Sequence, residues 1–175
     1  AVLLLLLGVE PALAQAQGAP AELRIAYPVD IPSWDPTSVT FPAGQSIYKT
    51  VFDSPLHMGD GSKVEAALIR EWRWIDQSAQ KLQVVLQDNA VFHDGSPVTA
   101  EDVRWSFARN LDPANKLAGL TRISTVTAVE TTGPNTIVLT TKGPDPILLV
   151  RVAQFAILPK AYLEKFPIFI AATRN

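Results

Sequence analysis

The stretch "VFHDGSPVTAEDVRWSFAR", residues 91–109, carries the clearest local signals in the chain. Its first half has the composition of a turn, because Asp94 can accept hydrogen bonds from the backbone two residues on and Gly95 supplies a positive φ. Thr99 is a good N-cap residue, and Asp102, three residues later, completes a capping-box-like pair. The stretch therefore predicts a turn that leads directly into a capped helix.

One face of that helix is apolar. Ala100, Val103, Phe107 and Leu111 recur at helical spacing and fall on the same side. Trp105 lies well off this face. We therefore expect the helix to pack on a core through its apolar face and to contact a second surface elsewhere.

His93 and Asp94 are the residues of this stretch that could carry chemistry. A general base needs an orienting partner within hydrogen-bond reach, and neighbours in sequence tend to point their side chains apart. A Ser-His-Asp hydrolase would also need an elbow such as G-x-S-x-G, which the sequence lacks. A metal site built on His93 and His57 would have no cysteine and no helical histidine pair. We predict no catalytic residue and no metal ligand, and an exported hydrolase that uses His93 and Asp94 stays as an alternative.

The composition is that of a globular protein. Of the 175 residues, 47% are hydrophobic and 18% are charged, with a formal net charge of −2 and a pI of about 5.7. No basic patch of the kind that binds nucleic acid is expected at this charge. The chain has no cysteine, so disulfides cannot stabilise it.

The first residues resemble a secretory leader. "AVLLLLLGVEPALAQAQGAP" is a short apolar run followed by the A-x-A pattern at residues 12–14. The run is too short to span a bilayer, which takes about 20 apolar residues. We interpret residues 1–14 as a truncated signal peptide. A signal peptide predicts export, and the expected location is the periplasm. Because no cysteine follows that could carry a lipid, we expect no lipid anchor.

Secondary-structure signals alternate along the rest of the chain. Polar and apolar residues alternate over 22–27, which predicts a first strand, and prolines make residues 28–42 an extended loop. Helical spacing begins at Ala43 and includes Val51 and Phe52. Further along, the patterns predict a turn at 58–62, strands at 71–76 and 81–87, a strand ending at 91–92, a hairpin around 132–135, and helices after Pro146 and near Pro159.

The sum of these elements is an α+β unit with mostly antiparallel strands and few helices. Trp72, Trp74 and Phe92 are expected in its core. A free-standing interaction module would need a complete core within these residues, and it remains a second alternative.

The stretch "LQVVLQDNAVFHDGSPVTAEDVRWSFAR", residues 82–109, resembles the signature of the extracytoplasmic solute-binding proteins of family 5. These are the oligopeptide, dipeptide and nickel type of ABC-transporter binding protein. The family pattern is a strand ending in Phe-His-Asp-Gly, then Pro, a small hydroxyl residue, Ala-Glu-Asp-Val and a helix with Ser and Arg. Other stretches resemble the family in the same order: "LRIAYPVDIPSWDPT", "YKTVFDSPL", "EAALIREWRW", "VTAVETTGPNTIVLTTKGPDP" and "LPKAYLEKF".

The resemblance implies a two-lobed periplasmic binding protein of type II, α/β in the full family. This chain would be the start of lobe I with its β-rich peripheral subdomain. Residues 15–42 would form the linker, first strand and loop of lobe I, and 43–166 the mixed α/β subdomain. Residues 167–175 would be a truncated end, because they stop where the family continues with Gly-Thr-Gly-Pro-Tyr.

The resemblance also implies a non-catalytic, monomeric receptor without a cofactor. It would capture a peptide or another small solute and deliver it to an inner-membrane ABC permease. In the family the loop after the first strand and a later segment approach the ligand cleft, which makes Ser33, Trp34, Phe41, Gln154 and Phe155 the candidate ligand-binding residues. For Trp34, packing against the subdomain is an equally good interpretation. For Phe41, a place in the core at the entry to the following helix is equally good.

Overall fold

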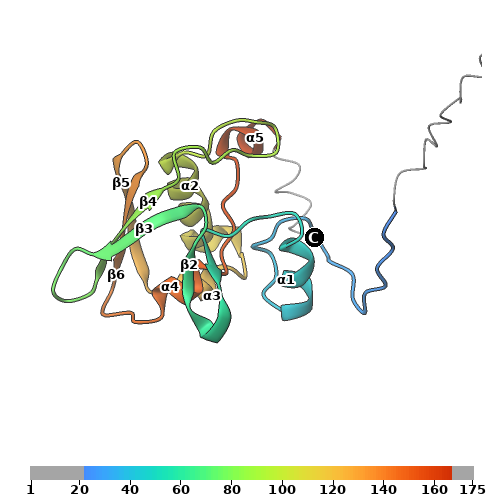
Figure 1. Cartoon of the computed structure of the whole chain (residues 1–175), viewed down its shortest axis with the longest axis horizontal. Helices are drawn as coiled ribbons and strands as arrows, with labels where there is room; N and C mark the ends of the chain where they lie inside the picture. The colour runs from blue at the N-terminus through green and yellow to red at the C-terminus, as the bar shows by residue number, and fades with distance from the viewer. Residues whose placement is uncertain (1–21, 167–175) are drawn as a thin grey trace, which may run out of the picture.

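A four-stranded antiparallel sheet forms the centre of the structure. The computed structural model describes residues 22–166, and the sheet runs in the order β3-β4-β6-β5 (Figure 1). Its strands are β3 (Ile69–Trp74), β4 (Lys81–Leu86), β5 (Val126–Gly133) and β6 (Thr136–Thr141). A two-stranded hairpin precedes the sheet, formed by β1 (Leu56–Met58) and β2 (Val64–Ala66).

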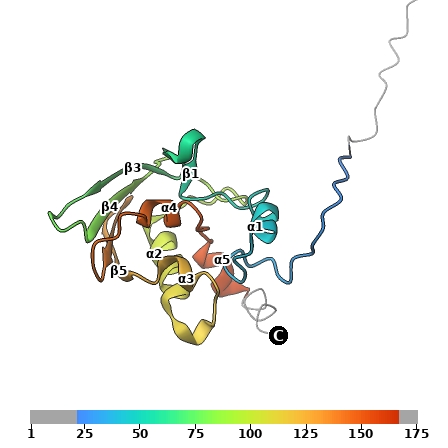
Figure 2. The same ribbon diagram turned by 90° about the horizontal axis from the view of Figure 1, so that it is seen from below.

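Helices α2, α3 and α4 lie together on one side of this sheet, as Figure 2 shows. The described helices are α1 (Pro42–Tyr48), α2 (Ala100–Leu111), α3 (Leu120–Ile123), α4 (Leu148–Val152) and α5 (Lys160–Lys165), with 3-10 turns η1 (Asp60–Ser62) and η2 (Pro113–Asn115). The longest of them, α2, packs against β5 and β6, and α3 contacts both α2 and α4.

The core lies between the sheet and α2. Leu82, Val84 and Leu86 of β4 are buried, which confirms the predicted alternation along that strand. From α2, Phe107 points into the same core and stacks on Phe155, with ring centroids 4.5 Å apart. Burial of each such side chain stabilises the fold by about 1.5–3 kcal/mol.

The turn and cap that precede α2 form as the sequence predicts. Asp94 Oδ1 accepts a hydrogen bond from the Ser96 backbone N at 2.9 Å, and Gly95 has a φ of 82°. Thr99 Oγ1 accepts from the Asp102 backbone N at 3.3 Å, and the Asp102 carboxylate accepts from the Thr99 backbone N at 2.9 Å. The capping box therefore satisfies backbone donors that would otherwise lack a partner.

Most other predicted elements are confirmed. The hairpin around residues 132–135 joins β5 to β6, and helices follow Pro146 and Pro159. Trp72, Trp74 and Phe92 are partly buried and pack against the core cluster. The α+β class is therefore confirmed by the described residues.

The predicted strand at 22–27 is wrong. These residues have no regular secondary structure, and the Leu23 and Ile25 side chains are 81% and 71% exposed. A strand is stabilised by hydrogen bonds to a neighbouring strand, and no segment of the described chain pairs with this one. Alternation alone does not supply that partner.

Two other boundaries differ from the prediction. α1 ends at Tyr48, so Phe52 lies outside the helix. The Phe52 backbone N donates to the Tyr48 carbonyl at 2.7 Å and closes a turn after the helix. Val91 does not end a sheet strand, because the chain folds back at once and Val91 pairs only with Pro97 in an isolated bridge. The Phe92 backbone N donates to the Ser96 carbonyl at 2.8 Å, which closes this small turn.

No helix within residues 22–166 is long and apolar enough to cross a membrane. The predicted signal peptide at 1–14 and the predicted truncated end at 167–175 both lie outside the described residues.

Candidate functional site

The proline loop, residues 28–42, is mostly exposed but has a buried centre. Asp35 is fully buried, and its carboxylate folds the chain locally into a turn. Asp35 Oδ1 accepts hydrogen bonds from the Thr37 backbone N at 2.9 Å and from Thr37 Oγ1 at 2.6 Å. An aspartate before a proline favours this kind of turn, because its side chain can hydrogen-bond the backbone two residues on.

A buried ion pair fixes the centre of the proline loop to α2. The Arg109 guanidinium, from a residue only 8% exposed, pairs with the Asp35 carboxylate and donates to Thr37 Oγ1 at 3.0 Å. The Gly119 backbone N donates to the Thr37 carbonyl at 2.9 Å. A buried charge is tolerated only when it is paired, so these contacts hold the loop in one position.

Sequence reasoning missed this buried polar face of α2. Asp102, Ser106 and Arg109 are spaced as one stripe along the helix, and all three are buried. Ser106 Oγ accepts from the Leu158 backbone N at 3.0 Å, and Asp102 Oδ1 accepts from the Lys160 backbone N at 3.0 Å. The signal was present as polar residues at i, i+4 and i+7, which is the spacing of a second helix face.

Arg122 of α3 makes a second connection to the proline loop. Its Nη1 donates to the Gln154 carbonyl at 2.6 Å and to Gln45 Oε1 at 3.1 Å, and its Nη2 lies 3.5 Å from the Thr40 carbonyl. Gln45 Nε2 in turn donates to the Val39 carbonyl at 2.6 Å. Burial lowers the pKa of the Arg122 guanidinium.

Tyr48 supplies a third connection, at the start of the loop. Its hydroxyl donates to the Ser33 carbonyl at 2.6 Å, and the Ser33 Oγ accepts from the Asp35 backbone N at 2.9 Å. Burial raises the pKa of the Tyr48 hydroxyl, so it remains a donor across the neutral range. Ser33 is therefore held at a defined position rather than free in a flexible loop.

The structure leaves four of the five predicted ligand-binding residues at least partly exposed, three on the proline loop and Gln154 after α4. Trp34 and Phe41 are 51% and 39% exposed on the proline loop, Ser33 lies beside Trp34, and Gln154 is exposed where Arg122 joins it to the loop. Phe155 is different, because it is only 2% exposed and stacks on Phe107 in the core. The two neighbouring residues after α4 thus face opposite ways: Gln154 faces the solvent and Phe155 faces the core.

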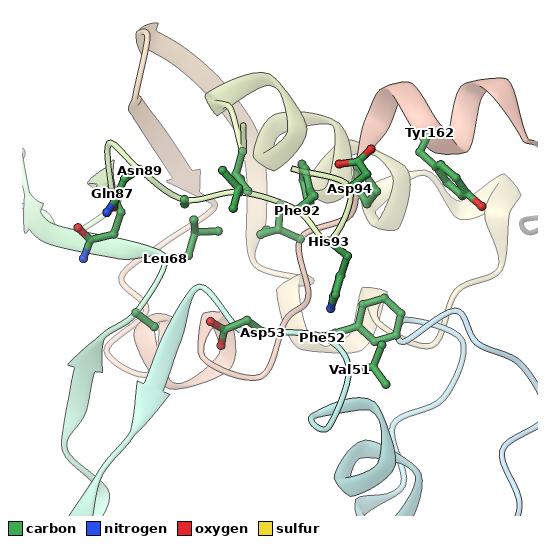
Figure 3. Close-up of a pocket in the computed structure, with 16 residues that line it drawn as sticks. Val51, Phe52, Asp53, Leu68, Gln87, Asn89, Phe92, His93, Asp94 and Tyr162 are labelled. Atoms are coloured by element: carbon green, nitrogen blue, oxygen red, sulfur yellow. The ribbon is translucent and has the colours of Figure 1, made fainter. Parts of the chain in front are cut away.

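A separate apolar groove of about 460 Å³ lies on another part of the surface (Figure 3). It is formed by residues 51–53, by the loop at 87–94, and by Pro159 and Tyr162 near α5. Sequence reasoning did not find it, because these segments are distant in sequence and no local pattern marks their meeting.

His93 lines this groove but forms no acid–base pair with Asp94. In Figure 3 the His93 imidazole extends toward Phe52, whereas the Asp94 carboxylate points the other way. Asp94 instead accepts from Ser96 Oγ at 2.6 Å, and that hydrogen bond holds the pKa of the Asp94 carboxyl below its usual value. His57 Nε2 lies 2.7 Å from Asp53 Oδ1, and both of these side chains are exposed.

Among residues 22–166, no group of three or more histidine, cysteine or acidic side chains is arranged to hold a metal ion.

Comparisons with known proteins agree in pointing to one class of protein. Residues 63–172 match the family model described as bacterial extracellular solute-binding proteins, family 5 Middle. A probable D,D-dipeptide-binding periplasmic protein, DdpA of Escherichia coli K12, is 37% identical over 94 residues, which cover 53% of this chain and 16% of the relative.

Solved structures show the same fold. NikZ from Campylobacter jejuni, in complex with Ni(L-His), superposes with a TM-score of 0.71 at 21% identity, over 79% of this chain and 27% of that one. The oligopeptide-binding protein AppA from Bacillus subtilis, in complex with a nonapeptide, superposes with a TM-score of 0.69 at 22% identity. The match covers 77% of this chain and 27% of AppA. The chain therefore spans about a quarter of these structures and less of the curated relative.

Proposed function

The chain belongs to the bacterial extracellular solute-binding proteins of family 5, and on that premise we propose that it is part of the solute-binding component of an ABC importer. The proposed solute is a peptide or a similar small molecule. The name of the E. coli relative specifies a D,D-dipeptide and that of the B. subtilis protein an oligopeptide, which supports a peptide as the first choice.

One observation carries this proposal: side chains of the neighbouring helices fix the position of the proline loop, while aromatic side chains of the loop stay exposed to solvent. Arg109 and Tyr48 bind it directly, and Arg122 contacts its Thr40 carbonyl, while Trp34 and Phe41 remain exposed. A surface fixed before binding loses little conformational entropy when a ligand arrives. Aromatic rings also supply large contact areas for the apolar parts of a small solute.

We propose that Ser33, Trp34, Phe41 and Gln154 form the ligand-side surface. Phe155 then supports this surface from the core, since its ring packs on Phe107 and is not accessible to a solute. Residues 15–42 would carry the first part of lobe I and 43–166 its subdomain.

The finer points of localisation and partnership follow from the same proposal. The protein would be exported by the leader at 1–14, act in the periplasm as a monomer without a lipid anchor, and deliver its solute to an inner-membrane permease. Its family and its relatives consist of binding proteins, so catalysis forms no part of the proposal.

The test is a titration of this chain with trialanine. Binding is monitored through the NMR signals of the Trp34 indole N–H and the Phe41 backbone amide. We expect saturable shifts at both, and about tenfold weaker binding in Trp34→Ala, because loss of an aromatic contact of this kind costs about 1.4 kcal/mol.

Tyr162→Ala is the matched control, since Tyr162 is a half-exposed aromatic residue in the apolar groove. It should leave binding unchanged. If Tyr162→Ala weakens binding while Trp34→Ala does not, or if trialanine shifts neither Trp34 nor Phe41, the proposed surface is wrong.

A further inference from the structure

Arg122 stands apart from the other arginines in the described part of the chain. Five arginines lie within ion-pair distance of a carboxylate: Arg24, Arg70, Arg104, Arg109 and Arg151. Arg73 has no carboxylate partner within residues 22–166, but it is exposed and hydrogen-bonds Gln83. Arg122 also has none there, although it is partly buried.

The hydrogen bonds of Arg122 leave one edge of its guanidinium unused. Nη1 is occupied by the Gln154 carbonyl and by Gln45 Oε1, at 2.6 and 3.1 Å. Nη2 has only a contact of 3.5 Å to the Thr40 carbonyl, and within the described residues Nε donates to no acceptor. A guanidinium carries five N–H donors, and its Nε–Nη2 edge matches the two oxygens of a carboxylate.

All the acceptors around Arg122 are neutral. Removing a cation from water without a counter-ion is unfavourable, and burial accordingly lowers the pKa of this guanidinium with no opposing effect from a nearby carboxylate. An anion that arrived from solution would supply the missing charge. Arg122 is itself only partly buried, and the two backbone carbonyls that it contacts belong to exposed residues, Thr40 and Gln154.

We propose that Arg122 binds a carboxylate group of the captured solute. This inference rests on the proposed function and deepens it, because it restricts the solute to molecules with a free carboxylate, such as a peptide with an unblocked C-terminus. Gln154, whose carbonyl Arg122 contacts, and Phe41, which follows Thr40 in the chain, would contact the remainder of the solute. Arginine suits this role better than lysine, since its planar fork can donate two parallel hydrogen bonds.

The first test uses sodium acetate on the intact chain, with sodium chloride added to keep the ionic strength constant. We expect the Arg122 Nε–H signal and the Gln154 backbone amide to shift saturably with acetate and not with acetamide, its neutral isostere. Arg122→Gln should abolish the shift at Gln154. Arg73→Gln, which removes the other arginine without a carboxylate partner, should leave it unchanged.

Arg122→Lys guards against a trivial loss of structure, because it keeps the charge while removing the fork. It should retain the folded NMR spectrum and bind acetate more weakly than the native chain. If acetate shifts Arg122 and Arg73 alike without saturation, or if Arg122→Gln responds as the native chain does, Arg122 is only a structural clamp and the proposal is overturned.

A second comparison separates this proposal from the proposed function. Trialanine and trialanine amide should both shift Trp34, but the amide should bind about tenfold more weakly, which corresponds to about 1.4 kcal/mol. Arg122→Gln should remove that difference. Equal binding of the two peptides would overturn the role of Arg122 and leave the proposed function intact, whereas no shift at Trp34 or Phe41 with either peptide would contradict the function itself.

Discussion

The pair formed by Asp35 and Arg109 shows how single residues can position a loop. Both side chains are almost completely buried, and 74 positions separate them in the sequence. Their pairing brings the centre of the proline loop onto α2. The pair matters less for its net electrostatic energy, which desolvation offsets, than for the cost of breaking it.

We predict that Asp35→Asn lowers the free energy of unfolding by about 3–5 kcal/mol, because it leaves the Arg109 guanidinium buried without a counter-ion. Urea denaturation followed by circular dichroism measures the change. Asp88→Asn is the control, since it breaks the pair of Asp88 with Arg70 at the surface and should have a much smaller effect. Equal effects of the two substitutions would contradict the view that burial makes the difference.

At the scale of elements, α2 organises the molecule through two faces. Its apolar face packs on the sheet, and its polar stripe holds the proline loop and the segment before α5. One helix thus joins three regions that are distant in sequence. The sequence predicted a second contact surface from the position of Trp105, whereas the contacts described here are made by the polar residues Asp102, Ser106 and Arg109.

The turn between β3 and β4 gives a prediction for pH dependence. The Asp76 carboxylate accepts hydrogen bonds from Ser78 Oγ and from the backbone N of Lys81 and Gln80, which lowers its pKa from the ordinary value of 3.8. A carboxyl whose folded pKa is depressed contributes stability above its unfolded pKa and loses that contribution as the pH falls through the folded pKa. We therefore expect the native chain to lose stability below about pH 4 partly through Asp76.

Urea midpoints measured from pH 6 to pH 2 provide the check. Asp76→Asn should reduce stability at pH 6 and flatten the acid limb of the profile. Asp60→Asn changes a carboxylate that accepts no hydrogen bond in the described structure, so it should leave the profile nearly as it is. A native-like acid limb in Asp76→Asn would show that the turn is not responsible.

At the scale of the whole molecule, the described residues enclose one contiguous apolar cluster. It extends from the β1–β2 hairpin through the sheet to α4 and includes Phe107 and Phe155. Such a cluster is sufficient for cooperative unfolding of a small domain. Cooperative unfolding would agree both with a lobe of a binding protein and with a module that folds alone, so it tests the fold and not the function.

We predict that the chain unfolds in one transition, with coincident curves for near-UV and far-UV circular dichroism. Phe107→Ala should lower the free energy of unfolding by about 3–5 kcal/mol, because it leaves a cavity against Phe155. Val91→Ala changes an exposed side chain and should alter it by less than about 0.5 kcal/mol. Separated curves, or equal effects of the two substitutions, would contradict a single well-packed core.

Much of this protein could be predicted from the sequence, because many of its features depend on interactions over a few residues. The turn at Asp94 and Gly95 and the capping box of Thr99 with Asp102 rest on hydrogen bonds that span two or three positions. The alternation in β4 likewise follows from the geometry of a strand with one buried face. Each of these signals can be interpreted without knowing what lies across the core.

Only the tertiary structure decided which distant segments meet. It left residues 22–27 unpaired despite their alternation, assembled the apolar groove from separate segments, and turned Phe155 inward while Gln154 faces outward. It also joined Arg122 to carbonyls 32 and 82 positions away. Such contacts depend on packing and on the pairing of buried charges across the whole chain, and no local pattern specifies which partner a strand edge or a guanidinium will find.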